Sequence, residues 1–553
     1  RDVERSRGLG DVYKRQFWYY LIMSVDTNNA AFQDALNLIQ YTRQSVFLTG
    51  KAGTGKSTFL RYVCENTKKK HVVLAPTGIA AINAGGSTMH SFFKLPFYPL
   101  LPDDPNLSLQ RGRIHEFFKY TKPHRKLLEQ IELVIIDEIS MVRADIIDAI
   151  DRILRVYSHN LREPFGGKQL LLVGDVFQLE PVVKNDEREI LNRFYPTPYF
   201  FSARVFGQID LVSIELQKVY RQTDPVFVGV LDHIRNNTAG AADLQLLNTR
   251  YGSQIEESEA DMYITLATRR DTVDSINEKK LAELPGDPIT FEGVIEGDFP
   301  ESSLPTSQEL VLKPGAQIIF IKNDFDRRWV NGTIGVIAGI DEEEETIYVI
   351  TDNGKECDVK RESWRNIRYR YNEKTKEIEE EVLGSFTQYP IRLAWAITVH
   401  KSQGLTFSRV VIDFTGGVFA GGQAYVALSR CTSLDGIQLK KPINRADVFV
   451  RPEIVNFAGR FNDRQAIDKA LKQAQADVQY AAASRAFDKG DMEECLEQFF
   501  RAIHSRYDIE KPVPRRFIRR KLGVINTLKE QNKKLKEQMR EQQERLRQYA
   551  HEY

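Results

Sequence analysis

The chain has 553 residues, enough for about three or four domains of about 150 residues each. Its 77 Lys and Arg residues balance 76 Asp and Glu residues, which excludes a uniformly basic nucleic-acid-binding protein but not a local basic groove. Four cysteines lie far apart without a CxxC pair, which favours a reducing compartment and argues against a zinc or disulfide framework. They are Cys64, Cys357, Cys431 and Cys495.

The N-terminal residues have no helical or strand periodicity. The apolar run at 17–23, FWYYLIM, is shorter than the roughly 20 residues that span a bilayer, and no small-residue cleavage site follows it. We expect Met23 to be the natural start and residues 1–22 to be a non-native or disordered leader.

Residues 50–58, GKAGTGKST, have the spacing of a P-loop, with Gly50, Gly55, Lys56 and Ser57 in register. An apolar run at 45–50 predicts a buried parallel strand before the loop, and residues 57–67 predict a helix after it. In this setting the backbone N–H groups of 52–57 would surround the phosphates of a nucleoside triphosphate. Lys56 would reach the β- and γ-phosphates, and Ser57 would hold Mg²⁺.

Three further apolar runs, at 71–76, 132–140 and 169–175, predict parallel strands of the same sheet. Asp137 and Glu138 come directly after four apolar residues of the second run, at the end of a strand where α/β sheets bind their ligands. Asp137 would hold Mg²⁺ through water, and Glu138 would polarise the attacking water. Gln178, after the last run, is suited to contacting the γ-phosphate. Residues 24–210 therefore predict a doubly wound parallel sheet with ATP at its edge.

A second α/β unit without a P-loop is predicted further along the chain, from the patterns at 211–222, 263–277, 394–414 and 424–433. A nucleotide bound between two such units needs cations from the second one, because an arginine that reaches across stabilises the charge of the transition state. Arg221 and Arg430 are the candidates.

These motifs, in this order, resemble the PIF (petite integration frequency) family of superfamily 1B DNA helicases. The resemblance covers about 32–436 and includes "APTGIAA…GGSTMHSFF" (75–93), "IIDEISM" (135–141), "GDVFQLEPV" (174–182), "LQKVYRQTD" (216–224), "VHKSQGLTF" (399–407) and "YVALSR" (425–430). The stretch DPVFVGVLDHIRNN (224–237) resembles the helical signature that separates this family from its RecD-like relatives.

The resemblance implies an ATP-driven motor that moves 5′ to 3′ on single-stranded DNA and unwinds duplexes and G-quadruplexes, with family roles in DNA repair, recombination and telomere maintenance. It assigns Gln33 to the adenine. The remaining nucleotide contacts that it implies are Gly50, Gly53, Thr54, Gly55, Lys56, Ser57, Thr58, Gln403 and Gly404. The DNA contacts that it implies are Thr77, Gly78, Thr88, His90, Thr398, His400 and Lys401.

Three segments lie outside the two helicase cores. The aromatic- and proline-rich segment from 92 to about 117 is a candidate strand-separating wedge, with an ordinary loop as the alternative. Short strand patterns at 316–322, 334–340, 346–351, 355–360 and 367–371, with a DNG turn at 352–354, predict an inserted Src-homology-3-like barrel over 288–390. The second core would then comprise 211–287 and 391–450.

After about 450 the sequence becomes helical. Residues 483–503 weakly resemble one tetratricopeptide helix pair, and 511–553 predict a basic helix. Its heptad places Ile525, Asn532, Met539 and Leu546 at one seam position and Leu528, Leu535, Gln542 and Tyr549 at the other. A homodimeric coiled coil and a single solvated helix both fit this pattern.

The sequence leaves three other functions open. A RecD-like motor subunit of a nuclease complex is disfavoured by the signature at 224–237, and a scaffold with a dead ATP site by the presence of every catalytic residue. An RNA helicase is harder to separate, because phosphate contacts discriminate poorly between DNA and RNA. We expect single-stranded, forked and duplex DNA as partners, no membrane, and a cytoplasmic, nucleoid-associated location in a bacterial cell.

Overall fold

The computed structural model describes Asp26 and residues 29–108, 113–222, 224–253, 262–326, 328–372, 374–375, 377–506 and 512–552. The leader at 1–22 and Met23 lie outside these residues. The chain divides into two compact units, one ending at Ile467 and the other spanning Asp468–Tyr553.

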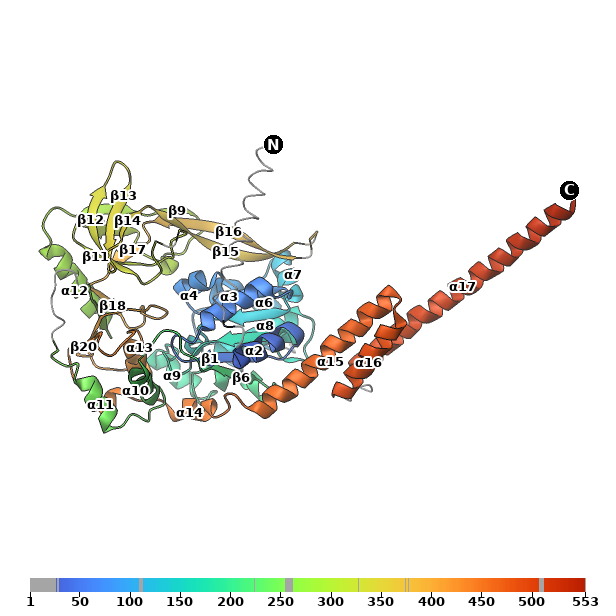
Figure 1. Cartoon of the computed structure of the whole chain (residues 1–553), viewed down its shortest axis with the longest axis horizontal. Helices are drawn as coiled ribbons and strands as arrows, with labels where there is room; N and C mark the ends of the chain where they lie inside the picture. Colours follow the sequence, from blue (N-terminus) through green and yellow to red (C-terminus); the bar gives the residue numbers. More distant parts are fainter. Residues whose placement is uncertain are drawn as a thin grey trace. The chain divides into compact units, whose positions relative to one another are not determined.

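The first core is a six-stranded parallel sheet in the order β3-β2-β4-β5-β1-β6. Figure 1 labels β1 and β6, which are neighbours at one end of this order. Its strands are β1 (Val46–Gly50), β2 (His71–Ala75), β3 (Ser87–Thr88), β4 (Leu133–Ile136), β5 (Gln169–Val173) and β6 (Val212–Leu216). The central strands β1, β4 and β5 are buried along their whole length, as continuous apolar runs predict for a sheet covered on both faces. The α-helices of this core are α2 (Ala30–Tyr41), α3 (Lys56–Asn66), α4 (Gly78–Ala84), α5 (Met89–Phe93), α6 (Ile114–Phe117), α7 (Lys122–Gln130), α8 (Ala144–Tyr157) and α9 (Asn185–Leu191).

The sequence-based boundary between the cores at residue 210 is wrong. Strand β6, predicted to belong to the second core, pairs in parallel with β1 from Val46 opposite Val212 to Gly50 opposite Leu216. It completes the first sheet at its edge. The pattern of one buried strand cannot specify which of two parallel sheets it joins, because both offer the same backbone pairing.

The second core is a four-stranded parallel sheet in the order β18-β7-β19-β20. Its strands are β7 (Ile264–Ala267), β18 (Ala396–Thr398), β19 (Val410–Asp413) and β20 (Ile437–Leu439). Its helices are α10 (Pro225–Arg235), α11 (Ala241–Asn248), α12 (Arg270–Glu283) and α13 (Gln423–Leu428). Buried side chains of α10 and α13 share one apolar cluster with β7 and β19, so the signature helix α10 packs on the second core.

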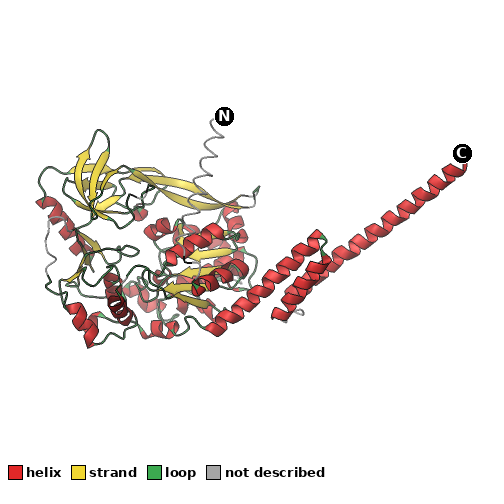
Figure 2. Ribbon diagram, viewed as in Figure 1, coloured by secondary structure: helices red, strands yellow, loops and turns green. Residues whose placement is uncertain are grey.

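Between β7 and β18 the chain forms antiparallel sheets, as the strand patterns predict (Figure 2). Their strands are β8 (Ile289–Glu292), β9 (Val294–Gly297), β10 (Glu309–Leu312), β11 (Gln317–Phe320), β12 (Ile334–Asp341), β13 (Thr346–Thr351), β14 (Glu356–Val359), β15 (Glu362–Asn372), β16 (Glu377–Gln388) and β17 (Ile391–Leu393). Five of them form a sheet in the order β14-β13-β12-β11-β17. The turn at 352–354 joins β13 and β14, which pair antiparallel, and this confirms the predicted hairpin.

The long β15–β16 hairpin extends from this insertion onto the first core. Tyr369 and Tyr371 of β15 belong to the apolar cluster of the first core. The amide of Val73 in β2 donates a hydrogen bond to the Tyr369 hydroxyl at 3.4 Å. The Lys70 ammonium lies 5.2 Å from the centre of the Tyr371 ring. Ile319 and Ile334 of the insertion belong to the apolar cluster of the second core, so the insertion contacts both cores of the first unit.

After the second core the chain returns to the first one. In α14 (Pro452–Ala458), Phe457 stacks on Phe201 with ring centroids 4.4 Å apart. Asn462 then binds the free edge of β6. Its side-chain oxygen accepts a hydrogen bond from the backbone amide of Glu215 at 2.8 Å, and its backbone amide donates to the Ser213 carbonyl at 3.0 Å. This return segment joins the end of the second core to the first sheet.

The second unit is helical. It contains most of α15 (Arg464–Lys489), together with α16 (Met492–Arg506) and α17 (Pro512–Glu552). Helix α17 is one continuous helix of 41 residues (Figure 2). Its seam residues Leu528, Leu535, Met539 and Leu546 are all exposed. In the described part of the chain, no helix is both long and apolar enough to cross a membrane.

We expect Phe457→Ala to destabilise the first core by about 3 kcal/mol, because it removes a ring that packs between the aromatic side chains of two distant segments. Thermal unfolding of the whole chain would measure this as a lower midpoint. Val455→Ala, in the same helix but 47% exposed, is the matched control. Equal midpoints for the two variants would contradict a structural role of the return segment.

Candidate active site

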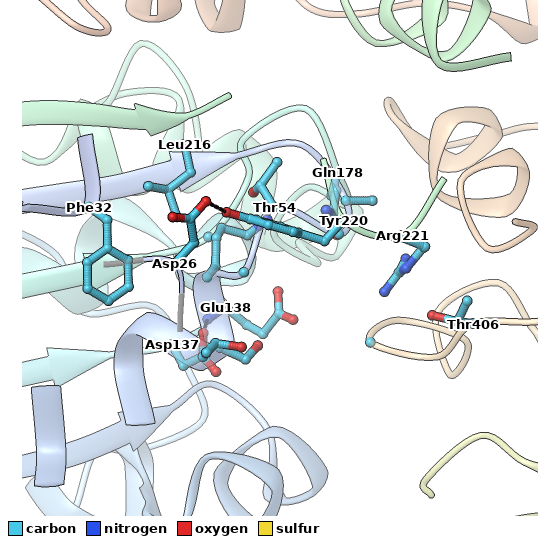
Figure 3. Close-up of a pocket in the computed structure, with 18 of the residues that line it drawn as sticks. Asp26, Phe32, Thr54, Asp137, Glu138, Gln178, Leu216, Tyr220, Arg221 and Thr406 are labelled. Carbon is cyan, nitrogen blue, oxygen red and sulfur yellow. Dashed lines mark hydrogen bonds between the residues drawn. The ribbon is translucent and has the colours of Figure 1, made fainter. Parts of the chain in front are cut away.

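A cavity of about 530 Å³ lies where the carboxyl ends of β1, β4 and β5 face the second core (Figure 3). Most of the residues predicted to bind nucleotide or to catalyse line it. These are Gly53, Thr54, Gly55, Lys56, Ser57, Thr58, Asp137, Glu138, Gln178, Arg221, Gly404 and Arg430. The structure thus brings together residues separated by more than 370 positions.

The P-loop follows β1 directly and leads into α3 through glycines in the left-handed region. Gly53 has φ +80° and Gly55 has φ +88°, conformations that L side chains rarely adopt. A Cβ on Gly53 would also lie 2.4 Å from the Cβ of Arg221. The loop therefore needs glycine at this position both for its backbone and for the close approach of the Arg221 segment.

Lys56 is folded back onto its own loop. Its ammonium donates hydrogen bonds to the carbonyl oxygens of Gly50 at 2.7 Å and Lys51 at 3.0 Å. Burial lowers the pKa of Lys56, and the Asp175 carboxylate opposes this shift. A bound phosphate would supply the negative charge that the two carbonyls only partly replace.

Asp137 and Glu138 follow β4 at the base of the cavity. Glu138 has φ +49°, so a sharp turn separates the two side chains. The amide of Glu138 donates to the Asp137 carboxylate at 2.9 Å. Burial raises the pKa of both carboxyl groups, and the neighbouring Asp137 raises that of Glu138 further. The Ser57 hydroxyl and the Asp137 carboxylate are oxygen ligands of the type that Mg²⁺ prefers, so the donor set fits this ion.

Gln178 belongs to a buried network at the boundary of the two cores. Its side-chain amide lies 3.4 Å from the Asp175 carboxylate, which also pairs with Arg235 of α10 at 3.1 Å. Arg235 pairs in addition with Glu215 of β6 at 2.9 Å and lies 4.3 Å from the centre of the Phe177 ring. The segment that carries Gln178 is therefore held by an arginine of the second core.

Arg221 and Arg430 place two cations at the same cavity. Arg430 is buried, and its guanidinium donates to the carbonyl oxygens of Val426 at 2.9 Å, Leu405 at 3.3 Å and Ser402 at 3.4 Å. It makes no ion pair with a carboxylate of the described residues. Burial, and secondly the charge of Arg221, lowers the pKa of Arg430 to about 9. An anion between the two arginines would relieve this repulsion.

Sequence reasoning did not predict the residues on one side of the cavity. Asp26, Asn29, Phe32, Leu216, Tyr220 and Thr406 also line it. The Tyr220 hydroxyl donates to the Asp26 carboxylate at 2.9 Å, the contact drawn as a dashed line in Figure 3. Tyr220 directly precedes Arg221, and its place beside a predicted site residue was the one available signal. Gln33, Gly50 and Gln403 are not among the lining residues of this cavity.

Two polar contacts join the P-loop to the second core. The amide of Ala52, one of the N–H groups predicted to surround the phosphates, donates to the Tyr425 hydroxyl of α13 at 3.0 Å. The Lys51 ammonium pairs with Asp232 of α10 at 2.5 Å. Movement of the second core relative to the first would act directly on the P-loop through these contacts.

A second cavity, of about 510 Å³, lies between the first core, the insertion and the second core. Three of the predicted DNA contacts, Thr77, His400 and Lys401, line it, together with Gln403. Arg392 also lines it and has no hydrogen-bond or ion-pair partner for its guanidinium among the described residues. Burial lowers the pKa of Arg392 to about 10. Arg392 and Lys401 thus place two basic side chains in this cavity, which Glu65, Asp137 and Glu138 also line.

The other predicted DNA contacts lie at the ends of strands and the starts of helices. Thr88 caps α5, its hydroxyl accepting from the amide of Ser91 at 3.2 Å, and His90 lies within that helix. The Thr398 hydroxyl accepts from the amide of Lys401 at 3.2 Å. A Cβ on Gly78 would lie 2.5 Å from the Ser303 hydroxyl, so the insertion covers this position closely.

Comparison with known proteins agrees with this architecture. Residues 25–233 match the family model of PIF1-like helicases. The chain is 34% identical over 414 residues to the ATP-dependent DNA helicase Pif1 of Campylobacter jejuni, covering 71% of this chain and 88% of that protein. Pif1 from Bacteroides sp in complex with ADP-AlF4 matches with 42% identity and a TM-score of 0.71, over 78% of this chain and 96% of that one.

Bacteroides Pif1 bound to single-stranded DNA is 41% identical over 79% of this chain and 97% of its own, with a TM-score of 0.56. At nearly equal coverage, the arrangement of this chain is closer to those of the ADP-AlF4 complex and of unliganded Bacteroides Pif1, which has a TM-score of 0.70, than to that of the DNA-bound form. Sequence, fold and site geometry agree: the chain belongs to the PIF1-like helicase family and is an ATP-dependent DNA helicase.

Proposed function

We propose that the cavity between the two cores is the ATP site, and that hydrolysis there drives movement along single-stranded DNA. The observation that carries this proposal is the buried Arg430, a second-core cation without a carboxylate partner in the described residues, at a cavity lined by the P-loop of the first core. An arginine in that position is worth roughly 10³–10⁵ in the rate of phosphoryl transfer.

Each side chain then has a distinct role. Lys56 leaves its two carbonyl partners to bind the β- and γ-phosphates, and Glu138 accepts the proton of the attacking water. Ser57 and Asp137 would hold Mg²⁺, which would neutralise charge on the phosphate oxygens. Gln178 contacts the γ-phosphate, and Arg221 and Arg430 stabilise the charge that develops on it.

The nucleobase side of the site is formed by residues that precede or follow the first sheet. We assign Tyr220, Phe32 and Asn29 to this side, because they line the cavity beyond the P-loop. Gln33 lies in the same helix as Phe32, and we retain it as the proposed adenine contact.

Coupling to DNA follows from the contacts between the cores. Hydrolysis changes the charge beside Gln178 and the arginines, and the Asp175–Arg235 pair transmits that change to α10. Thr77, Gly78, Thr88 and His90 grip the strand from the first core, and Thr398, His400 and Lys401 grip it from the second. Because phosphates are the same at every position, such a grip is independent of sequence.

The direction of movement, 5′ to 3′, and activity on G-quadruplexes are proposed from family resemblance. Solved structures of Bacteroides Pif1 bound to single-stranded DNA and of Pif1 helicases at forked duplex DNA support these substrates for the present chain. DNA association at the nucleoid follows from such substrates. ATPase and unwinding assays on 5′-tailed, 3′-tailed and RNA-tailed duplexes test this proposal. Preferred unwinding of the 3′-tailed or RNA-tailed substrate would contradict it.

Two accessory parts complete the motor. The segment from 92 to about 117 is proposed as the wedge that separates the strands, a task that costs roughly 1–2 kcal/mol per base-pair step. The inserted sheets at 288–390 are proposed to form a Src-homology-3-like barrel that covers the bound strand. The contact between Ser303 and Gly78 supports this placement, because it brings the insertion to a predicted DNA contact.

The C-terminal segment 511–553 is proposed to add DNA affinity and to pair two chains. It carries thirteen Lys or Arg and five Glu residues, a net charge of +8. The exposed seam of α17 supports a homodimer, with Asn532 fixing the register of two parallel helices.

Lys56→Ala should abolish ATP hydrolysis while DNA binding is retained, because the variant loses the cation that binds the phosphates. Glu138→Gln should bind ATP but hydrolyse it slowly, since the amide keeps the shape of the side chain and loses its basicity. Steady-state ATPase and nucleotide-binding assays measure both effects. Turnover near that of the wild type in either variant would refute the assignment of this site.

Arg430→Ala should lower the hydrolysis rate by about 10³-fold and change ATP affinity less, because the charge it stabilises is greatest in the transition state. Arg430 also holds three backbone carbonyls, so the unfolding midpoint must be measured alongside the rate. Arg430→Lys, which keeps the charge, should recover part of the rate. A loss below tenfold with a normal midpoint would contradict a catalytic role.

Deletion of 511–553 should leave the DNA-saturated ATPase nearly unchanged and weaken DNA binding most at low salt, because a basic helix acts through counterion release. Sedimentation should show a dimer for the full-length chain and a monomer for the deletion variant. An unchanged dependence of DNA affinity on salt would count against the proposed DNA contact. Collapse of the DNA-saturated ATPase would instead mean that the segment is part of the motor fold.

A further inference from the structure

One buried side chain binds the backbone on both sides of Arg430. Gln222 is 6% exposed, and its side-chain amide donates to the carbonyl oxygens of Ser429 and Cys431, each at 3.1 Å. A glutamine amide has two N–H donors, so each donor has one of these carbonyls as its partner. Gln222 therefore holds the main chain immediately before and immediately after the arginine.

The guanidinium of Arg430 depends on the position of this main chain. Helix α13 ends at Leu428, and the guanidinium donates to the carbonyl of Val426 in that helix at 2.9 Å and to the Ser429 hydroxyl at 2.9 Å. The carbonyl of Arg430 itself accepts from the amide of Phe407 at 2.9 Å. Because the cation is bound to its own helix and to the residue before it, a shift of this backbone moves the cation as well.

Gln222 belongs to a short segment that is also attached to the P-loop. The amide of Tyr220 donates to the carbonyl of Gly53 at 2.9 Å. The Arg221 guanidinium donates to the Ser429 carbonyl at 3.3 Å, beside the bond from Gln222. Residues 220–222, which we call the linker bridge, thus connect the phosphate-binding loop of the first core to the backbone that carries the arginine of the second core.

The linker bridge fixes the distance between these two parts of the active site. The effect of a catalytic cation depends steeply on its position, and a misplacement of about 1 Å can cost about 10²-fold in rate. Nucleotide binding depends mainly on the P-loop, which is complete without the bridge. A loosened bridge should therefore weaken interactions made in the transition state more than those made with bound ATP.

We propose that Gln222 is a positioning residue for ATP hydrolysis. It holds the backbone of Arg430 at the distance from the P-loop at which the guanidinium reaches the γ-phosphate. This inference rests on the ATP site and on the role of Arg430 proposed above. Gln222 acts on the reaction only through Arg430, which distinguishes it from a residue that binds the nucleotide.

The test compares Gln222→Met with Gln317→Met in the full-length chain. Methionine keeps the length of the side chain and has no N–H donor. Gln317 of the insertion is the matched control, because it is 8% exposed and its amide donates to the carbonyl oxygens of Tyr263 and Ala394, both at 2.7 Å. In a DNA-saturated ATPase assay, Gln222→Met should lower kcat by about 10- to 100-fold and change KM for ATP by less than about threefold. Gln317→Met should keep the kcat of the wild type.

A double variant separates positioning from a structural role. Once the cation is removed, its placement no longer affects the rate, so Gln222→Met combined with Arg430→Gln should turn over within about twofold of Arg430→Gln alone.

Gln222→Asn is the second variant, in case the methionine variant has a lowered unfolding midpoint. It keeps the amide but is one methylene shorter, so it cannot reach both carbonyls and should show the same selective loss of kcat.

Three results would overturn the inference. They are a kcat of Gln222→Met within about twofold of that of Gln317→Met, a loss confined to KM, and losses that multiply in the double variant. Each would mean that Gln222 does not act through Arg430. Turnover near that of the wild type in Arg430→Gln alone would refute the proposed role of Arg430 itself, and the inference with it.

Discussion

The buried guanidinium of Arg430 is the interaction on which the active site depends. A cation removed from water without an opposite charge costs several kcal/mol. Here backbone carbonyls of the second core replace water around it, and no described carboxylate pairs with it. Arg221 adds a second cation to the same cavity. The positive charges of Arg430 and Arg221 in this cavity are therefore not balanced by an ion pair to Arg430, and they favour an anionic ligand such as a nucleotide phosphate.

The contacts between the cores explain how that ligand can drive movement. Tyr425 holds a P-loop amide, Asp232 holds the P-loop Lys51, and Arg235 holds the Asp175 segment next to Gln178. All three contacts belong to helices α10 and α13 of the second core. A phosphate that displaces or reorients these groups changes the fit between the cores, and the strand-binding residues on both cores move with them.

Sequence patterns identified the phosphate-binding residues, because a P-loop has a fixed spacing and acidic residues directly follow a buried strand. Lys56 and Glu138 both line the cavity between the cores, as this prediction requires. The strand β6 was assigned to the wrong core, because the composition of one buried strand does not specify which of two parallel sheets it joins. The return of Phe457 to the first core and the Tyr220–Asp26 contact were likewise unpredictable, because each joins segments far apart in the chain.

The most direct test of the account compares binding of ADP with binding of ADP plus aluminium fluoride, which imitates the transferring phosphoryl group. Titration calorimetry with Mg²⁺ present would give both affinities for the wild type and for Arg430→Gln. We predict that the wild type binds the aluminium fluoride complex much more tightly, and that Arg430→Gln loses most of this preference while its ADP affinity is unchanged. An equal preference in a correctly folded Arg430→Gln variant would contradict the central claim that the second core supplies the cation for phosphoryl transfer.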